Sequence, residues 1–105
     1  MSNASELAHI CKVLSVETRV RILELVKERS LCVGAIAARL DVTQGAVSQH
    51  LRILRDAGLV VAEKRGYFVH YELNEKKMNR CKNLMNMLTT GKKNHSASAN
   101  SSDIN

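Results

Sequence analysis

Aromatic residues are scarce: the chain has no tryptophan and one phenylalanine, and aromatics make up 3% of its 105 residues. Aliphatic side chains must therefore build the core, and with 45% hydrophobic residues the chain can form one domain. Long apolar runs are missing too, since none exceeds four residues and a membrane span needs about 18. No charged-then-apolar secretory signal opens the sequence. We therefore expect a protein of the cytoplasm with no membrane partner.

Catalytic patterns are also missing. The sequence contains no nucleophile–base pattern, no glycine-rich phosphate loop and no close cluster of histidine and carboxylate residues. Ser48 and His50 lie two positions apart on an expected helix, so their side chains point in different directions. We therefore expect that the protein is not an enzyme.

Cysteines are few and widely spaced, at Cys11, Cys32 and Cys81, with no CxxC pair. An odd number at such spacing is not a disulfide framework, and reduced thiols in the cytoplasm are expected.

Charge is abundant by contrast: sixteen Lys and Arg against ten Asp and Glu give a net charge of +6. A basic balance in a small domain favours a polyanionic partner, of which nucleic acid is the commonest.

Hydrophobic spacing predicts two helices in the first 28 residues. Apolar residues at i, i+3, i+4 and i+7 predict a short helix over residues 7–14. Ser15 can cap a second helix that runs to about Glu28, with Arg19 facing mostly outward. The residues expected to face inward are Val20, Leu23 and Val26.

Two further helices follow, separated by a short break. Apolar residues predict a third helix over 33–40, and residues 41–43 interrupt the pattern. Thr43 is a good N-cap for a fourth helix, and Gly58 followed by apolar Leu59 marks its end. The buried stripe of this fourth helix is expected to be Val47, Leu51 and Leu54.

The period then changes from helix to strand. Residues 61–64 and 68–73 alternate as strands, with a hairpin turn at Arg65-Gly66. Asn74 can cap a last helix, whose heptad-like seam is suited to packing against another helix. That seam is Met78, Cys81, Met85 and Leu88. The whole order predicts a mainly α (α+β) fold, a winged helix-turn-helix of about five helices with a two-stranded β-hairpin wing.

The exposed face of the fourth helix has the composition of a DNA-reading surface. Small residues let a helix enter the major groove, glutamine pairs bidentately with adenine, and arginine reads guanine or neutralises phosphate. An ordinary solvated helix face explains the same residues, and that reading stays open. The candidates for contact with double-stranded DNA are Thr43, Gln44, Ala46, Ser48, Gln49, His50 and Arg52.

The hairpin tip adds the candidates Lys64, Arg65 and Tyr67 around Gly66. Beside a duplex these side chains can touch backbone phosphate or the minor groove, which positions a protein without reading sequence. As an alternative, the two cations only discourage edge-to-edge strand pairing.

Three stretches carry a specific resemblance: LSVETRVRILELV (residues 14–26), LCVGAIAARLDVTQGAVSQHLRILRDAGLV (residues 31–60) and FVHYEL (residues 68–73). Together they resemble the ArsR/SmtB family of bacterial transcriptional repressors over about residues 6–88. The resemblance implies a homodimer that binds an inverted-repeat operator and is released by an inducer, in many members a metal or metalloid ion or an oxidant. It also implies that the first and last helices form the dimer interface, and that residues 44–52 read DNA.

Two histidines have different expected roles. His50 lies near the rim of the exposed face, where it either donates to a phosphate or packs at the base of the helix. His70 in the wing strand is expected to be structural.

The family's metal sites are not intact in this sequence. A thiolate site on the third helix needs two cysteines separated by one residue, but Cys32 is followed by Val33-Gly34. The zinc-type site on the last helix needs Asp and His pairs, and residues 74–88 contain neither. Cys11, Cys32 and Cys81 remain as candidates for a thiophilic ion. Cys11 and Cys81 are otherwise small hydrophobes, or an oxidisable pair if the terminal helices meet across a dimer.

The expected domain organisation is an N-terminal extension at residues 1–5, a DNA-binding and dimerisation domain at 6–88, and a disordered polar tail at 89–105. Two alternatives to an inducible repressor remain. One is a winged-helix module for protein contacts, and the other is a DNA-binding regulator with no small-ligand sensor.

Overall fold

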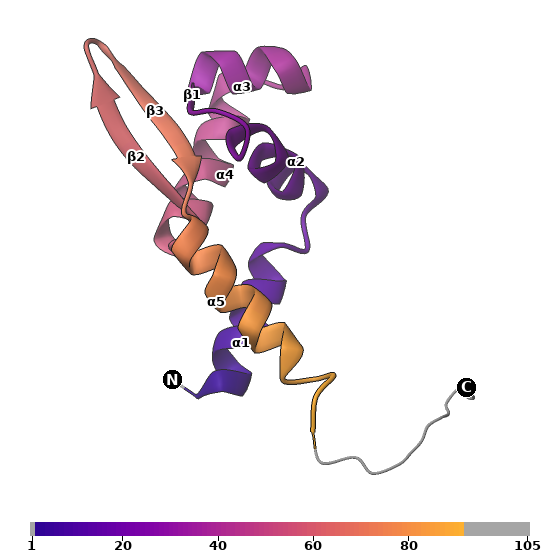
Figure 1. Ribbon diagram of the computed structural model, residues 1–105. Coiled ribbons are helices and arrows are strands. Elements are labelled where there is room, and N and C mark those ends of the chain that lie inside the picture. The colour runs from indigo at the N-terminus through magenta and orange to yellow at the C-terminus, as the bar shows by residue number, and fades with distance from the viewer. Residues whose placement is uncertain (1, 92–105) are drawn as a thin grey trace.

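The computed structural model describes residues 2–91, which form five helices and three short strands (Figure 1). The elements are α1 (Asn3–Val13), α2 (Glu17–Val26), β1 (Leu31–Cys32), α3 (Val33–Leu40), α4 (Gln44–Asp56), β2 (Val60–Arg65), β3 (Phe68–Leu73) and α5 (Glu75–Asn86). The strands form one antiparallel sheet in the order β1-β3-β2. This arrangement confirms the winged helix-turn-helix prediction. None of the helices described is long and apolar enough to cross a membrane.

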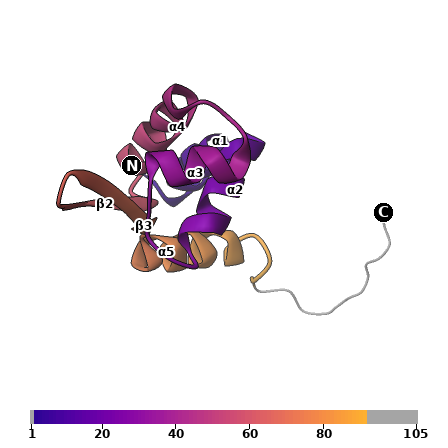
Figure 2. The same ribbon diagram turned by 90° about the horizontal axis from the view of Figure 1, so that it is seen from above.

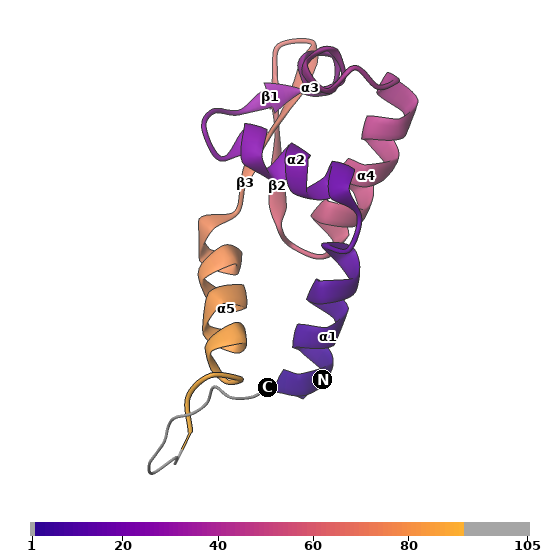
Figure 3. The ribbon, with the colours of Figure 1, turned by 90° about the vertical axis from the view of Figure 1, so that its right-hand side faces the viewer.

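The hydrophobic core has two parts. The larger cluster joins α2, α3 and α4 to the inner face of the sheet, and Ile22, Ile36 and Val47 are fully buried in it. The smaller cluster holds α1 against α5 through Leu7, Ile10 and Leu84. These two helices extend together from the helix–sheet unit (Figures 1 and 3).

The turn between α3 and α4 forms as the sequence predicts. Asp41 ends α3 in the left-handed conformation with φ 57°. Thr43 then caps α4, because its hydroxyl oxygen accepts from the backbone N–H of Ala46 at 3.1 Å. Seen from above, α3 and α4 cross, and the hairpin projects beside them (Figure 2).

The end of α4 is a Schellman motif. The N–H of Gly58 donates to the carbonyl of Arg55 at 2.8 Å, and the N–H of Leu59 donates to the carbonyl of Leu54 at 2.9 Å. Gly58 has φ 79°, and Leu59 is fully buried. The stop signal read from Gly58 and Leu59 is therefore confirmed.

The wing differs from its prediction in two details. Its strands pair from Val60↔Leu73 to Arg65↔Phe68, so the turn residues are Gly66 (φ 64°) and Tyr67, one position later than expected. A third strand, β1, pairs with β3, so the two-stranded wing belongs to a three-stranded sheet. β1 has only two residues, too few to show an alternating pattern.

The second helix was predicted wrongly at its start and on one face. The N-cap of α2 is Val16, without a side-chain cap, and Ser15 Oγ instead donates to the carbonyl of Lys12 at 2.7 Å. Val20 is 40% exposed rather than inward, whereas Leu23 and Val26 are buried as expected. Arg19 is half-buried rather than outward.

The terminal helices also differ from expectation. α1 begins at Asn3, with Ser2 as its cap, so it reaches into the expected N-terminal extension. On α5 the fully buried residue is Leu84, while Met85 and Leu88 of the predicted seam are exposed. Asn74 caps α5 as predicted, since its Oδ1 accepts from the N–H of Lys77 at 3.2 Å. Most of the expected polar tail lies outside the described residues.

Candidate nucleic-acid interface

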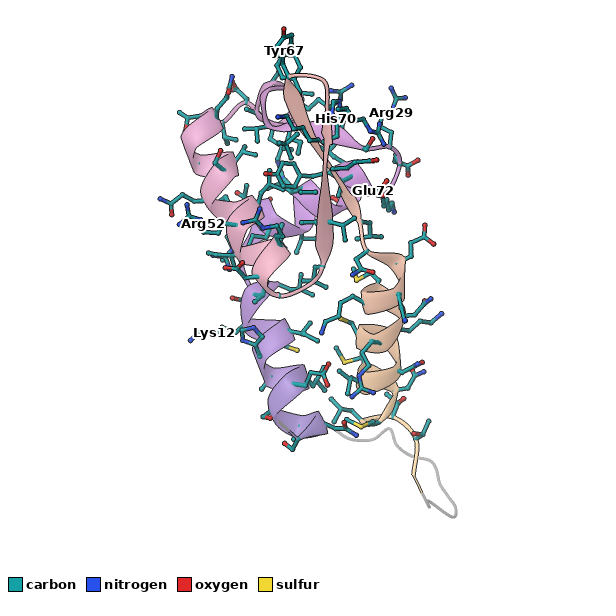
Figure 4. The ribbon with its side chains drawn as sticks, turned by 90° about the vertical axis from the view of Figure 1, so that its left-hand side faces the viewer. Lys12, Arg29, Arg52, Tyr67, His70 and Glu72 are labelled. Atoms are coloured by element: carbon teal, nitrogen blue, oxygen red, sulfur yellow. The ribbon has the colours of Figure 1, made fainter. Side chains whose placement is uncertain are left out.

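One side of α4 is anchored in the core and the other is free. Val47, Leu51 and Leu54 are at most 1% exposed. The opposite side is polar, and Arg52 points away from the body (Figure 4). The exposed predicted residues on and before α4 are Thr43, Gln44, Ser48, Gln49 and Arg52. Ala46 is half-buried, so its small side chain shapes the surface without donating or accepting hydrogen bonds.

The wing tip stands clear of the body. Tyr67 is 98% exposed at its apex (Figure 4). Lys64 is exposed as well. Arg65 is held in place by Glu63, with its Nη2 at 3.0 Å from the carboxylate oxygen. Because both partners are at least half exposed, this pair is weak and can exchange for a phosphate.

The wing and the start of α4 border the same hollow of about 330 Å³. Gln44 contributes from α4, and Tyr67, Phe68 and Val69 contribute from the wing. The fold therefore brings together the two segments that the sequence predicted as DNA contacts.

His50 does not lie on the free face of α4. It is half-buried, and its Nδ1 accepts a hydrogen bond from Arg19 Nε at 3.2 Å. Burial lowers the pKa of His50, and the charge of Arg19 lowers this pKa further, so the ring is neutral at pH 7. A direct DNA contact by His50 stays a prediction, with one ring nitrogen already engaged.

Two cations of this region were missed at the level of the sequence. Arg19 was expected to face outward, and no local pattern links it to a histidine 31 positions away. Lys12 is exposed on α1 and points to the same side as Arg52 (Figure 4). The sequence could not predict that Lys12 lies on the same side as Arg52, because this depends on the angle between α1 and α4.

The thiols do not form a metal site within the described chain. Cys11 is exposed, and Cys32 and Cys81 are half-buried, all three free. Burial raises the pKa of Cys81, which disfavours its thiolate. Across residues 2–91 no group of three or more His, Cys, Asp and Glu side chains could hold a metal ion. The described residues of one protomer therefore supply no such ligand group for a metal or metalloid.

His70 lies directly opposite Cys32 in the sheet. Its Nδ1 is buried and has no hydrogen-bond partner among the described residues. The structural role expected for His70 is consistent with this half-buried position in the sheet, although the Nδ1 atom is not satisfied.

A polar, outward helix after a tight turn, with an exposed basic wing beside it, defines a winged helix-turn-helix DNA-binding protein. Residues 17–61 match the family described as bacterial regulatory protein, arsR family. The reduced form of HlyU from Vibrio cholerae, a solved structure, superposes with a TM-score of 0.69 at 32% identity, covering 82% of this chain and 90% of HlyU. The chain belongs to the ArsR family of DNA-binding transcriptional regulators.

Two other relatives extend the comparison. The arsenical resistance operon repressor of Escherichia coli is 42% identical over 64 residues, which are 60% of this chain and 55% of the repressor. The chain thus aligns with only about half the length of that protein. A winged helix-turn-helix DNA-binding domain from Mycobacterium bovis, described as homodimeric, matches with a TM-score of 0.68 at 26% identity, covering 82% of this chain and 80% of that domain.

Proposed function

We propose that the protein is a homodimeric repressor that binds an inverted-repeat operator with one α4 in each of two successive major grooves. The observation that carries the proposal is α4 itself, buried along Val47, Leu51 and Leu54 and polar on the side that faces outward. A two-fold dimer of such helices reads half-sites about 34–36 Å apart. Its proposed target is operator DNA, which places its action in the cytoplasm, and the proposal includes no catalytic step.

The dimer is supported by apolar side chains that one chain leaves uncovered. On and after α5, Met85 is 48% exposed and Leu88 is 71% exposed. Exposed apolar side chains three positions apart at the end of a helix favour burial against another helix. The homodimeric Mycobacterium bovis relative supports a second copy of this chain as the partner. The proposed interface is formed by α1 and α5.

The two DNA-facing segments have different roles. Gln44, Ser48 and Gln49 face the groove and read base edges, because amide and hydroxyl groups match the donors and acceptors of bases. Lys64, Arg65 and Tyr67 on the wing contact the backbone or the minor groove, which supplies affinity without sequence discrimination.

Release by an inducer is tested separately from DNA binding. No group of three or more His, Cys, Asp and Glu side chains that could hold a metal forms within residues 2–91, so the proposal assigns no ion to this part of the protomer. The expected inducer is tested by titrating arsenite, cadmium or peroxide into the DNA complex of the wild-type protein and of a variant with all three cysteines changed to serine. Release of the wild type alone would assign the sensor to thiols, and release of neither favours a regulator without a sensor.

The function is tested by fluorescence anisotropy on DNA selected from a random duplex library. Arg52→Ala should weaken binding about tenfold or more, because it removes a base or phosphate contact. Arg29→Ala is the matched control, since Arg29 is exposed on the opposite side of the molecule (Figure 4). Gln49→Ala should weaken binding to the selected sequence alone, whereas Lys64→Ala should weaken all sequences alike. Equal losses from Arg52→Ala and Arg29→Ala would contradict the assigned face.

A further inference from the structure

The guanidinium group of Arg19 lies between the last turn of α1 and the middle of α4. Its Nη1 donates to the carbonyl oxygen of Val13 at 3.1 Å, and its Nε donates to Nδ1 of His50 at 3.2 Å. Both bonds are part-buried, and they connect three helices through one side chain.

The two hydrogen bonds of Arg19, to Val13 and to His50, form a bridge between α1 and α4, and each bond has a chemical cause. Val13 is the last residue of α1, and the carbonyls of a last turn have no partner within the helix. A cation there is also favoured by the helix dipole. At the other end, His50 accepts with Nδ1, so its ring is neutral and its proton lies on Nε2. The planar fork of arginine makes both bonds at fixed angles, which a lysine cannot reproduce.

The bridge joins the two functional surfaces of the protein. α1 packs against α5, where the proposed dimer interface lies, and α4 carries the proposed DNA-reading face. In a dimer, a change in the angle between α1 and α4 alters the spacing of the two reading helices. Operator affinity depends on that spacing, whereas non-specific attraction to phosphates does not.

We propose that Arg19 is a positioning residue that sets the angle of α4 relative to α1, and that His50 acts through Arg19 rather than by touching DNA. This inference rests on the proposed function. Loss of the bridge should weaken operator binding about tenfold, the size of a typical coupled interaction. Affinity for non-specific DNA should change little.

The test is a double-mutant cycle of Arg19→Ala and His50→Ala, measured by anisotropy on the selected operator and on a scrambled duplex. The proposal expects each single variant to lose operator affinity about tenfold and the double variant to lose no more than either. Additive losses, or equal losses on the scrambled duplex, would overturn it. Arg21→Ala is the control on the same helix, because Arg21 is exposed and its one ion pair among the described residues is with Glu17.

A second variant distinguishes positioning from direct contact. In His50→Asn, Oδ1 takes the place of Nδ1 as the acceptor for Arg19, while Nε2 is lost. Binding close to wild type supports the bridge, and a loss equal to that of His50→Ala shows that Nε2 contacts DNA and refutes it. If Arg19→Ala does not fold, this histidine pair decides alone. If the wild type selects no sequence at all, the proposed function fails instead, which is a separate outcome.

Discussion

At the scale of single residues, His50 connects α4 to α2 through its hydrogen bond with Arg19. Its ring is half-buried and accepts from a permanently charged guanidinium, so protonation costs more in the folded chain than in the unfolded one. The group therefore contributes stability that is present above its unfolded pKa and is lost as the pH falls towards its lowered folded pKa.

The first prediction follows from the lowered pKa of His50 in the folded chain. The free energy of unfolding should decrease as the pH falls below about 6.5, because the unfolded chain then binds the proton more readily. Urea denaturation at pH 7.5 and pH 5.5 measures the effect. The His50→Asn variant should lose less stability between the two pH values, and an identical loss in both proteins would refute the assignment.

Residues close in sequence were predictable at this scale, and distant pairs were not. Thr43, Gly58 and Asn74 were recognised because a cap acts on neighbours within a few positions. Arg19 and His50 are 31 positions apart, so their hydrogen bond depends on how α2 packs on α4. The hydrophobic period alone did not show that Arg19 is half-buried.

At the scale of elements, the stability of a helix depends on how its ends are capped, and the C-terminal end of α4 gives the second prediction. Gly58→Ala should lower the free energy of unfolding by about 1 kcal/mol, because alanine is strained at φ 79°. The nearest atoms to an added Cβ are methylenes of Lys77 at 3.7 Å, an ordinary contact, so strain rather than collision is the cause.

Gly45→Ala is a control of opposite sign. An added Cβ at Gly45, in the first turn of α4, meets nothing within 4 Å. Alanine is a better helix former there, so this variant should be equally stable or more stable by up to about 1 kcal/mol. Chemical denaturation of both variants checks the pair, and a loss at both positions would contradict the account of the Schellman motif.

Element order was predictable, while some element faces were not. The switch from helical to alternating spacing after Leu59 located the wing correctly. On α5, however, Leu84 and Met85 both fit an apolar stripe, and only packing against α1 shows which of them is buried. β1 was missed because two residues carry no period.

At the scale of the whole molecule, the uncovered apolar residues after the core of α5 give the third prediction. Leu88→Lys combined with Met85→Lys should convert a dimer into a monomer, because two charges would be buried in an apolar interface. Light scattering after size exclusion measures the mass. Tyr67→Lys, at the 98% exposed wing tip, should leave the dimer intact. A dimer that survives the double substitution would place the interface elsewhere.

The central claim is that two symmetric copies of α4 read DNA through the major groove. Dimethyl sulfate footprinting on the selected operator tests it most directly, since the reagent reports guanine N7 in that groove. We expect two protected segments with centres about 10 base pairs apart, both weakened in Gln49→Ala at the same protein concentration because that variant binds the operator less tightly. A single protected segment, or protection that persists unchanged in that variant, would contradict the account.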